Sequence, residues 1–336
     1  VGVLAHPEVR APYSRPPWRV GTRIKRRALL DAVPDTNANR TLQASGLVVA
    51  STLGFGAISV LTLVAMRDGT SLQSVLSLRY ALATAALIPV AGGLRALRLP
   101  RRRTFGLAGA GGAGQALLTG LGLSALRYLP AATVSFLFYT YPVWVTLLEA
   151  ATGAERLTRV RVAALVLAVV GLAVMIGSPF SGRLSAAGIA LSLAAALVYA
   201  VYIPLVGRLQ TGVSPTVAST WITIGAGVMY LGASLATHTF GLPVAAEGWG
   251  AVVALALFST VAAFVLFLRG LAVLGPVRTA IISTVEPFFT AILAALVLGQ
   301  ALTLRTFAGG TLIVAAVVLI NLGKERRPDA ERPGDR

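Results

Sequence analysis

The chain has 336 residues, of which 56% are hydrophobic and only 12% are charged, and its mean hydropathy is +0.80. A soluble domain carries about twice that charged fraction, so the composition excludes an ordinary soluble protein and indicates an all-α integral membrane protein. The chain has no cysteine, which excludes disulfides and thiolate metal sites. Its two histidines are too few and too far apart for a histidine metal site, and we expect no metal and no cofactor.

Residues 1–45 hold eight basic residues, three acidic residues and several prolines. Such a segment cannot bury a core, and we predict a disordered basic tail in the cytoplasm. No apolar run directly follows Lys25-Arg26-Arg27, so we predict no signal peptide. The net charge of +17 would suggest nucleic acid as the partner of a soluble protein. Here we expect the basic residues to lie beside anionic lipid headgroups, with the lipid bilayer and no nucleic acid as partner.

Ten apolar runs of membrane-spanning length follow the tail. The runs are continuous rather than alternating, which predicts helices and not a β-barrel. A charged segment, 323–336, ends the chain and is predicted to be a second cytoplasmic tail. The predicted spans are 46–66, 72–92, 104–124, 131–151, 160–177, 185–205, 216–236, 248–268, 278–298 and 304–322.

The distribution of lysine and arginine predicts the orientation. With the N-terminus inside, the cytoplasmic segments carry 24 of the 29 Lys and Arg residues and the external segments carry 4. Because positive residues accumulate in cytoplasmic loops, we predict a multi-pass protein of the cell (inner or plasma) membrane with both termini in the cytoplasm.

An internal repeat links the fourth and ninth predicted spans. When residues 131–158 are shifted by 145 positions, Pro142 falls on Pro287 and Thr158 on Thr303. The two spans are separated by an odd number of crossings and must therefore cross the membrane in opposite directions. We predict two inverted five-helix repeats, 46–177 and 185–322, a plan frequent in secondary transporters.

The repeated pattern resembles a known family. Each copy has a proline, then about thirteen residues, then Glu/Gln-x-Leu-Thr: Pro142 with Glu155-Arg156-Leu157-Thr158, and Pro287 with Gln300-Ala301-Leu302-Thr303. This pattern is similar to the EamA domain of the drug/metabolite transporter superfamily, and Leu78-Arg79-Tyr80 is similar to an arginine often found in the second span of that family. Gln300 departs from the glutamate usual at its position. The resemblance implies ten-helix permeases that export or exchange small organic solutes, often amino acids, and it does not fix the substrate.

Glu286 is the leading candidate for a functional residue. It lies roughly 12 Å into the ninth span, at 1.5 Å per residue, and is followed by Pro287. A carboxylate at this depth must pair, bind a proton or face water. We expect it either to couple transport to a proton or to contact the substrate. Packing of the glutamate against a neighbouring backbone is the alternative.

Further candidates surround a predicted cavity near the middle of the membrane. Aromatic side chains could ring it or simply pack. Arg79 could attract a substrate carboxylate or extend to the external interface, and Gln115 could bind a ligand or another helix. Glu149 is expected to be solvated at the membrane interface. The predicted substrate-binding residues are Glu286, Tyr139, Tyr141, Trp144, Phe288, Arg79 and Gln115.

Residues 109–114, GAGGAG, match the G-x-G-x-x-G pattern of dinucleotide-binding proteins. That pattern requires a preceding strand, whereas here it lies within an apolar span, so we interpret it as a site of close helix packing.

The sequence predicts a secondary transporter that exports or exchanges small organic metabolites, such as amino acids or amphipathic compounds, by alternating access. It contains no P-loop and no acidic cluster or Ser/His/Asp set, so we predict that it is not an enzyme. A non-transporting membrane scaffold or sensor is the alternative, and it predicts a collapsed interior without a polar-lined cavity.

Overall fold

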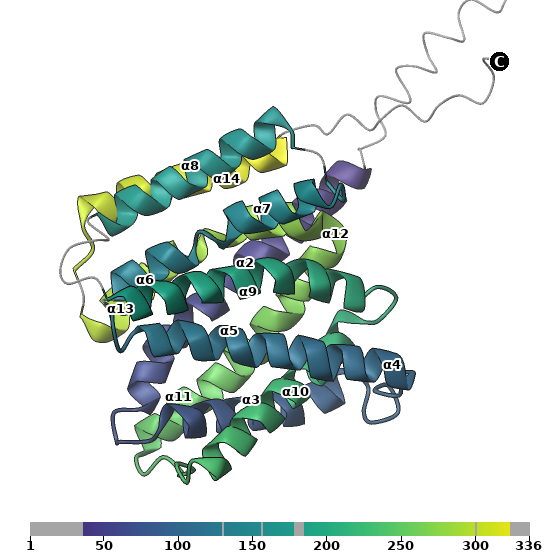
Figure 1. The fold of residues 1–336 in the computed structure, drawn as a ribbon, viewed down its shortest axis with the longest axis vertical. Coiled ribbons are helices and arrows are strands. Elements are labelled where there is room, and N and C mark those ends of the chain that lie inside the picture. The colour runs from purple at the N-terminus through teal and green to yellow at the C-terminus, as the bar shows by residue number, and fades with distance from the viewer. Residues whose placement is uncertain (1–35, 130, 156, 178–184, 300, 323–336) are drawn as a thin grey trace, which may run out of the picture. The chain divides into compact units, whose positions relative to one another are not determined.

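The computed structural model describes residues 36–129, 131–155, 157–177, 185–299 and 301–322, all of which lie in helices or in the connections between them. The helices from Thr41 onward pack as one unit (Figure 1). The predicted tails lie outside the described residues except for 36–45, which are helical and form the start of the first helix.

The elements are α2 (Thr36–Ala65), α3 (Leu72–Val90), α4 (Arg101–Thr104), η2 (Phe105–Gly111), α5 (Gly112–Ala125), α6 (Ala131–Phe138), α7 (Tyr141–Ala151), α8 (Arg159–Ile176), α9 (Ala186–Leu209), α10 (Pro215–Ala236), α11 (Ala246–Ala256), η3 (Leu257–Ala262), α12 (Ala263–Ser283), α13 (Glu286–Leu298) and α14 (Leu304–Leu322).

Among the described residues, eight helices are long and apolar enough to cross a membrane. One of them, Ala246–Ser283, combines the predicted eighth span with the start of the ninth, because the helical pattern continues through a kink at Gly275. Gly275 has φ 74°, which favours glycine. The predicted third span consists of α4, η2 and α5, where η2 is a π-helical segment. All-helical membrane architecture is therefore confirmed, and the predicted helix boundaries agree with the structure to within a few residues at most ends.

Local sequence explains where several helices begin and end. Ser71, Thr158 and Ser185 precede α3, α8 and α9, and each side chain accepts a hydrogen bond from a backbone N–H of the first turn. Helix α13 ends at Gly299, whose left-handed conformation (φ 68°) stops the helix.

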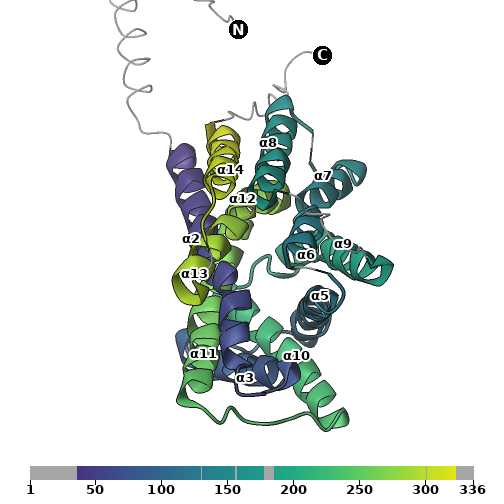
Figure 2. The same cartoon turned by 90° about the vertical axis from the view of Figure 1, so that its left-hand side faces the viewer.

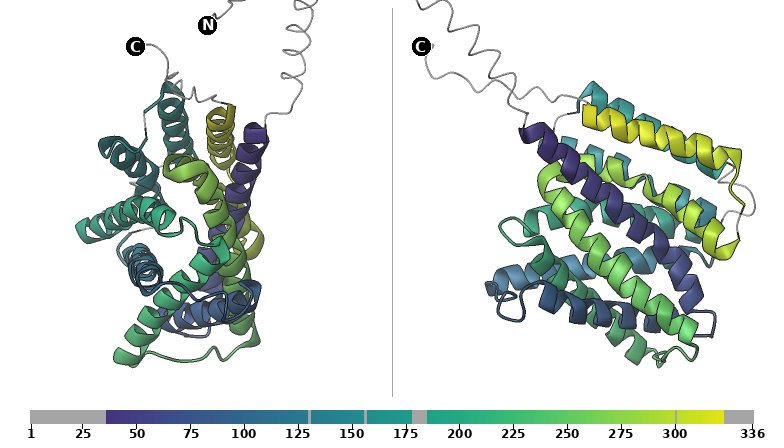
Figure 3. Two further views of the ribbon diagram at one scale, coloured as in Figure 1. Left: turned by 90° about the vertical axis from the view of Figure 1, so that its right-hand side faces the viewer. Right: turned by 180° about the vertical axis from the view of Figure 1, so that it is seen from behind.

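Helices at corresponding positions of the two matching halves lie side by side. Figure 1 shows α8 and α14 running antiparallel as one pair, and α3 and α10 form another pair at the other end of the bundle, as Figure 2 also shows. Glycines permit the α8–α14 contact: a methyl group on Gly171 would lie 2.8 Å from the carbonyl oxygen of Gly309. Viewed from behind, in Figure 3, α2 lies along α12, where a methyl group on Gly54 would lie 2.7 Å from the Ala263 side chain.

The GAGGAG segment packs against α10 at backbone distance. A methyl group on Gly112 would lie 2.6 Å from the Cα atom of Gly225, and one on Gly225 would overlap the Ala108 carbonyl oxygen. The interpretation of this segment as a close helix contact is confirmed, since neither backbone could approach if these residues carried side chains.

The connections gather at two ends of the helices. At the first, which we call the Asp68 end, the Asp68 carboxylate accepts hydrogen bonds from the backbone N–H groups of Val244 (2.7 Å) and Ala245 (3.2 Å). At the other, which we call the Glu155 end, Glu155 pairs with Arg161 at 2.8 Å, and Glu149 lies 3.6 Å from Arg208.

Candidate functional site

A cavity of about 560 Å³ lies between the two matching halves, and eight of the ten predicted spans contribute residues to its wall. No described residue of α8 or α14 lines it. Its wall extends from Glu286 to Met66 and Arg127 at the Asp68 end, while none of the described residues that line it lies in the connections of the Glu155 end. Four of the seven predicted site residues line this cavity: Glu286, Tyr139, Arg79 and Gln115.

A break in each of two helices brings Glu286 and Tyr139 together. Helix α6 ends at Phe138 and α7 begins at Tyr141, while α12 ends at Ser283 and α13 begins at Glu286. In both helices the proline next to the restart lacks a backbone N–H, so a helix can begin there without losing a hydrogen bond. The break leaves Glu286 half-buried on the cavity wall, with its carboxyl group near the Tyr139 hydroxyl.

The neighbourhood of Glu286 is closely packed by α2. The Thr290 hydroxyl lies one turn further along α13 and donates to the Glu286 carbonyl oxygen at 3.1 Å. A methyl group on Gly56 of α2 would lie 3.0 Å from the Thr290 hydroxyl and 3.2 Å from that same carbonyl oxygen. Glycine at position 56 therefore lets α2 cover the start of α13 while Glu286 still faces the cavity.

Tyr141 does not line the cavity but supports its wall. Its side chain is fully buried, and its hydroxyl donates to the Ala280 carbonyl oxygen at 3.4 Å. Its ring lies 4.5 Å from the ring of Tyr199, which does line the cavity together with Phe138. The prediction that Tyr141 rings the cavity is corrected: it holds α7 against α12 and stands behind Tyr199.

Trp144 and Phe288 also lie away from the cavity. Trp144 is 38% exposed on the helix surface, and its indole N–H donates to the Thr140 hydroxyl at 3.2 Å. Phe288 packs over Gly310 of α14, where any side chain would overlap its ring. The sequence predicted that both rings lie at the cavity together with Tyr139 and Glu286. Because α7 restarts after the break, it does not continue the helical phase of α6, and Phe288 lies two residues beyond Glu286, on another face of α13.

Arg79 is buried on the cavity wall rather than extended to the interface. It is 2% exposed, and its Nε–H donates to the Thr260 hydroxyl at 2.7 Å. Its Nη2 lies 3.4 Å from the Ser259 carbonyl oxygen, and its guanidinium carbon is 5.2 Å from the ring centre of Tyr80. The alternative in which this side chain reaches the external interface is wrong, because Thr260 and Ser259 of η3 bind it within the helical layer.

Gln115 belongs to a small polar group beside Arg79. Its amide Nε2 lies 3.3 Å from the Tyr80 hydroxyl and 3.4 Å from the Thr119 hydroxyl. The Tyr80 ring stacks on Tyr230, with ring centres 5.8 Å apart. Gln115 therefore contacts the neighbouring helix α3 through Tyr80 and also lines the cavity.

Sequence reasoning missed several polar residues on the wall, among them Tyr80, Thr260 and Thr290. Each stands in an apolar span, and hydroxyl groups are so common there that the sequence offers no signal that separates cavity residues from residues bonded to their own helix.

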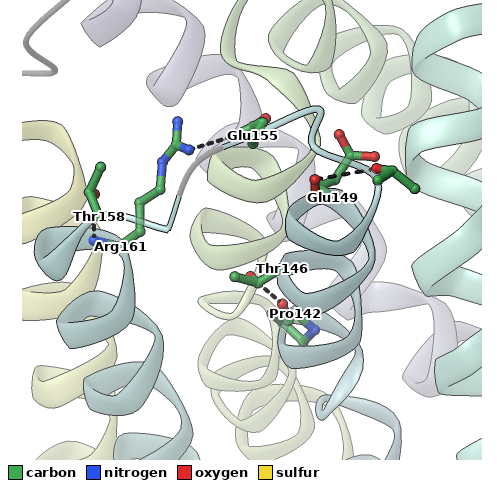
Figure 4. Close-up of polar contacts among 7 residues, drawn as sticks. Pro142, Thr146, Glu149, Glu155, Thr158 and Arg161 are labelled. Atoms are coloured by element: carbon green, nitrogen blue, oxygen red, sulfur yellow. Dashed lines mark hydrogen bonds and ion pairs between the residues drawn. The ribbon is translucent and has the colours of Figure 1, made fainter.

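The Glu155 end, whose connections contribute no described residue to the cavity wall, holds a cluster of charged residues (Figure 4). Glu155 and Arg161 form an ion pair in which both side chains are mostly buried, while Glu149 is 4% exposed and pairs with the exposed Arg208. The Thr158 hydroxyl accepts a hydrogen bond from the Arg161 N–H at 3.3 Å and so caps α8. The expectation that Glu149 is solvated at the interface is therefore wrong, because α9 and the connection after α7 cover it.

Comparison with known proteins agrees with this architecture. The chain is 30% identical over 287 residues to the probable terminal-alkyne amino-acid exporter of Streptantibioticus cattleyicolor, covering 80% of this chain and 91% of that protein. It is 31% identical over 156 residues to the uncharacterized inner membrane transporter YicL of Salmonella typhimurium, a match that covers 46% of this chain and spans about half (51%) of that relative.

A solved crystal structure, 20% identical in sequence, matches the fold with a TM-score of 0.71 over 83% of this chain and 96% of that chain. The sequence model of the EamA-like transporter family matches twice, at residues 43–177 and 186–322. With most of its length matched in two copies, the chain belongs to the EamA-like transporter family of multi-pass membrane proteins, as the repeated Pro and Glu/Gln-x-Leu-Thr pattern predicted.

Proposed function

We propose that this protein is a secondary transporter that exports or exchanges small organic metabolites by alternating access between two inverted five-helix halves. The observation that carries the proposal is the 560 Å³ cavity, walled by helices of both halves and containing Glu286, Tyr139, Arg79 and Gln115. A scaffold or sensor would need no such cavity, and its interior would be expected to collapse. The sequence has no P-loop, so coupling to ATP would need a partner protein, and we propose gradients of solutes or protons as the source of energy.

The inverted arrangement is supported by the two broken helices. Their interruptions lie at matching positions of the repeat, and the helix pairs α3–α10 and α8–α14 join corresponding helices of the two halves. Such contacts between equivalent elements are what a two-fold axis in the membrane plane produces.

The orientation proposed from the basic residues places the Asp68 end outside and the Glu155 end in the cytoplasm. The cavity then opens to the outside, with the ion pairs of Glu155 and Glu149 at the closed cytoplasmic end. Alternating access is expected to separate the Glu149–Arg208 pair, which joins α7 of the first half to α9 of the second, when the cavity opens to the cytoplasm. The membrane is the inner or plasma membrane, in line with the inner-membrane relative.

Amino acids and amphipathic metabolites are the proposed substrates, supported by the relative described as a probable amino-acid exporter. The test is a transport screen in vesicles reconstituted with the purified protein, over amino acids and amphipathic metabolites, with and without a pH gradient. We expect protein-dependent movement of at least one such solute. If no solute moves faster than in protein-free vesicles while the protein stays folded, the transport proposal is wrong.

A further inference from the structure

Arg79 is a buried cation that lies on the cavity wall without a carboxylate partner in the described part of the chain. It is the eighth residue of α3, well inside the helix. Arginine stays protonated in proteins, so burial cannot neutralise it. A buried charge is costly unless an opposite charge compensates it, and such a residue inside a membrane protein marks a ligand path.

The π-helical segment η3 fixes the guanidinium group from one side. The Thr260 hydroxyl donates to the Leu255 carbonyl oxygen at 2.9 Å, five residues earlier, a spacing that fits a π turn. Having donated its one hydrogen, this hydroxyl can only accept from Nε of Arg79, at 2.7 Å. Ser259, also in η3, offers its carbonyl oxygen to Nη2 at 3.4 Å.

These bonds occupy the edge of the guanidinium group that carries Nε and one hydrogen of Nη2. Among the described residues no hydrogen bond is made to Nη1. The edge formed by Nη1 and the second hydrogen of Nη2 therefore remains available. Two parallel N–H donors of this kind match the two oxygens of a carboxylate.

The charges of the cavity favour the same ligand. Among the described residues of its wall, the cations are Arg79 and Arg127 and the carboxylate is Glu286. Even with Glu286 ionised, positive charge is in excess, and Arg127 stands at the Asp68 end, where a solute enters or leaves. A positively lined mouth raises the local concentration of anions.

The remaining wall is mainly apolar and includes Phe55, Phe138, Phe264 and Leu118. We propose that Arg79 binds the carboxylate of a substrate that carries this group on a small apolar body, and that Thr260 is a positioning residue for the guanidinium group. This inference rests on the proposed transport function and narrows its substrate class. Apolar α-amino acids and simple apolar carboxylic acids share the required carboxylate.

Three probes of similar shape test the proposal: phenylalanine, 3-phenylpropionate, which lacks the amino group, and phenethylamine, which lacks the carboxylate. Binding to the purified full-length protein is measured as a thermal shift, and transport as counterflow into reconstituted vesicles. We expect phenylalanine and 3-phenylpropionate to bind, and at least phenylalanine to be transported. Phenethylamine should neither bind nor be transported. If 3-phenylpropionate is transported as well as phenylalanine, the amino group has no role in recognition, and this result supports the proposal equally.

Substitutions at Arg79 and at Thr260 test the binding residue and the positioning residue separately. Arg79→Gln should weaken carboxylate binding by roughly 10- to 100-fold, the loss expected for a charge-assisted pair. Thr260→Val keeps the shape and removes the hydroxyl, so it should raise KM for phenylalanine without lowering the maximal rate, and Thr260→Ser should restore KM. Arg67→Gln is the matched control, because Arg67 is exposed and pairs with Glu247 outside the cavity.

Two results would overturn the proposal. In the first, phenethylamine moves as fast as phenylalanine and Arg79→Gln transports both normally, so the protein is a transporter but Arg79 selects no carboxylate. In the second, neither carboxylate binds the folded wild-type protein, so the substrate class is wrong, and the wider solute screen decides separately whether the protein transports. Arg79→Lys, which keeps the charge, provides a folded variant if Arg79→Gln does not accumulate.

Discussion

Tyr141 and Glu286 each begin the second part of an interrupted helix, and they occupy equivalent positions in the two matching segments, from 141 to 286, a shift of 145. The same break therefore has a different function in each half. In the first half the break leaves the side chain of Tyr141 buried between α7 and α12. In the second half it leaves the carboxyl group of Glu286 on the cavity wall. This asymmetry within a repeated architecture singles out Glu286 for mutation.

Glu286→Gln should leave the protein folded, because the amide keeps the shape and removes a charge from the helical layer. If Glu286 carries the coupling proton, uptake driven by a pH gradient should be abolished, while exchange between equal pools should be partly retained because it needs no net proton movement. Both activities are measured in reconstituted vesicles, with Glu247→Gln, an exposed glutamate paired with Arg67, as the control. Equal loss of both activities would instead indicate contact with the substrate, and normal driven uptake would make the carboxylate structural.

Gly225→Ala should destabilise the protein by about 1–3 kcal/mol, because the added methyl group would overlap the Ala108 carbonyl oxygen and force η2 and α10 apart. Gly232→Ala is the matched control in the same helix, since nothing lies within 4 Å of its added methyl group. That control should be neutral or stabilise α10 by about 0.5–1 kcal/mol. Thermal unfolding in detergent compares the two, and equal midpoints would contradict the backbone contact.

Cysteine labelling tests the orientation in a chain that has no cysteine of its own. Arg67→Cys and Glu247→Cys, at the Asp68 end, should react with an impermeant thiol reagent added to intact cells. Arg98→Cys, in the connection between α3 and α4, should react only after the membrane is permeabilised. The reverse pattern would place the Asp68 end in the cytoplasm and invert the proposed orientation.

Asp68 should make stability depend on acid pH. The hydrogen bond from the Thr70 side chain, followed by that from the Ala245 backbone, lowers the pKa of Asp68 from 3.8 to about 2. Because the folded-state pKa is the lower one, this contribution is present above pH 3.8 and is lost as the pH falls towards 2. Between those values the melting temperature of the wild type should fall more steeply than that of Asp68→Asn, measured in detergent. Parallel curves would mean that the connection between α10 and α11 does not depend on this carboxylate.

The sequence predicted the helices well because each is a long apolar run with a polar connection, and this signal needs no knowledge of neighbours. The repeat aligned Pro142 with Pro287, the prolines that stand next to the two helix breaks, but both spans were predicted as uninterrupted helices. The same features could not tell which side chains face the cavity. Tyr139 lies in one of the breaks, where the helical phase changes, so the positions of Tyr141 and Trp144 could not be deduced from the spacing along the chain.

The burial of Arg79 could not be predicted from the sequence either. Whether an arginine reaches the interface or stays within the helical layer depends on what a distant helix offers. Here the partners are Thr260 and Ser259, some 180 residues away, in a segment whose π-helical pattern has no recognisable composition.

Helices α8 and α14 pack on each other through Gly171 and Gly309 and contribute no described residue to the cavity wall. Only 22% and 33% of their apolar windows are buried within the protein, so most of their surface faces lipid. The sequences of α8 and α14 can therefore change to suit the thickness and composition of the host membrane without any change in the residues that line the cavity. A chimera that exchanges both helices together for those of a relative should keep the substrate range of this chain, whereas exchange of one alone should break the glycine contact.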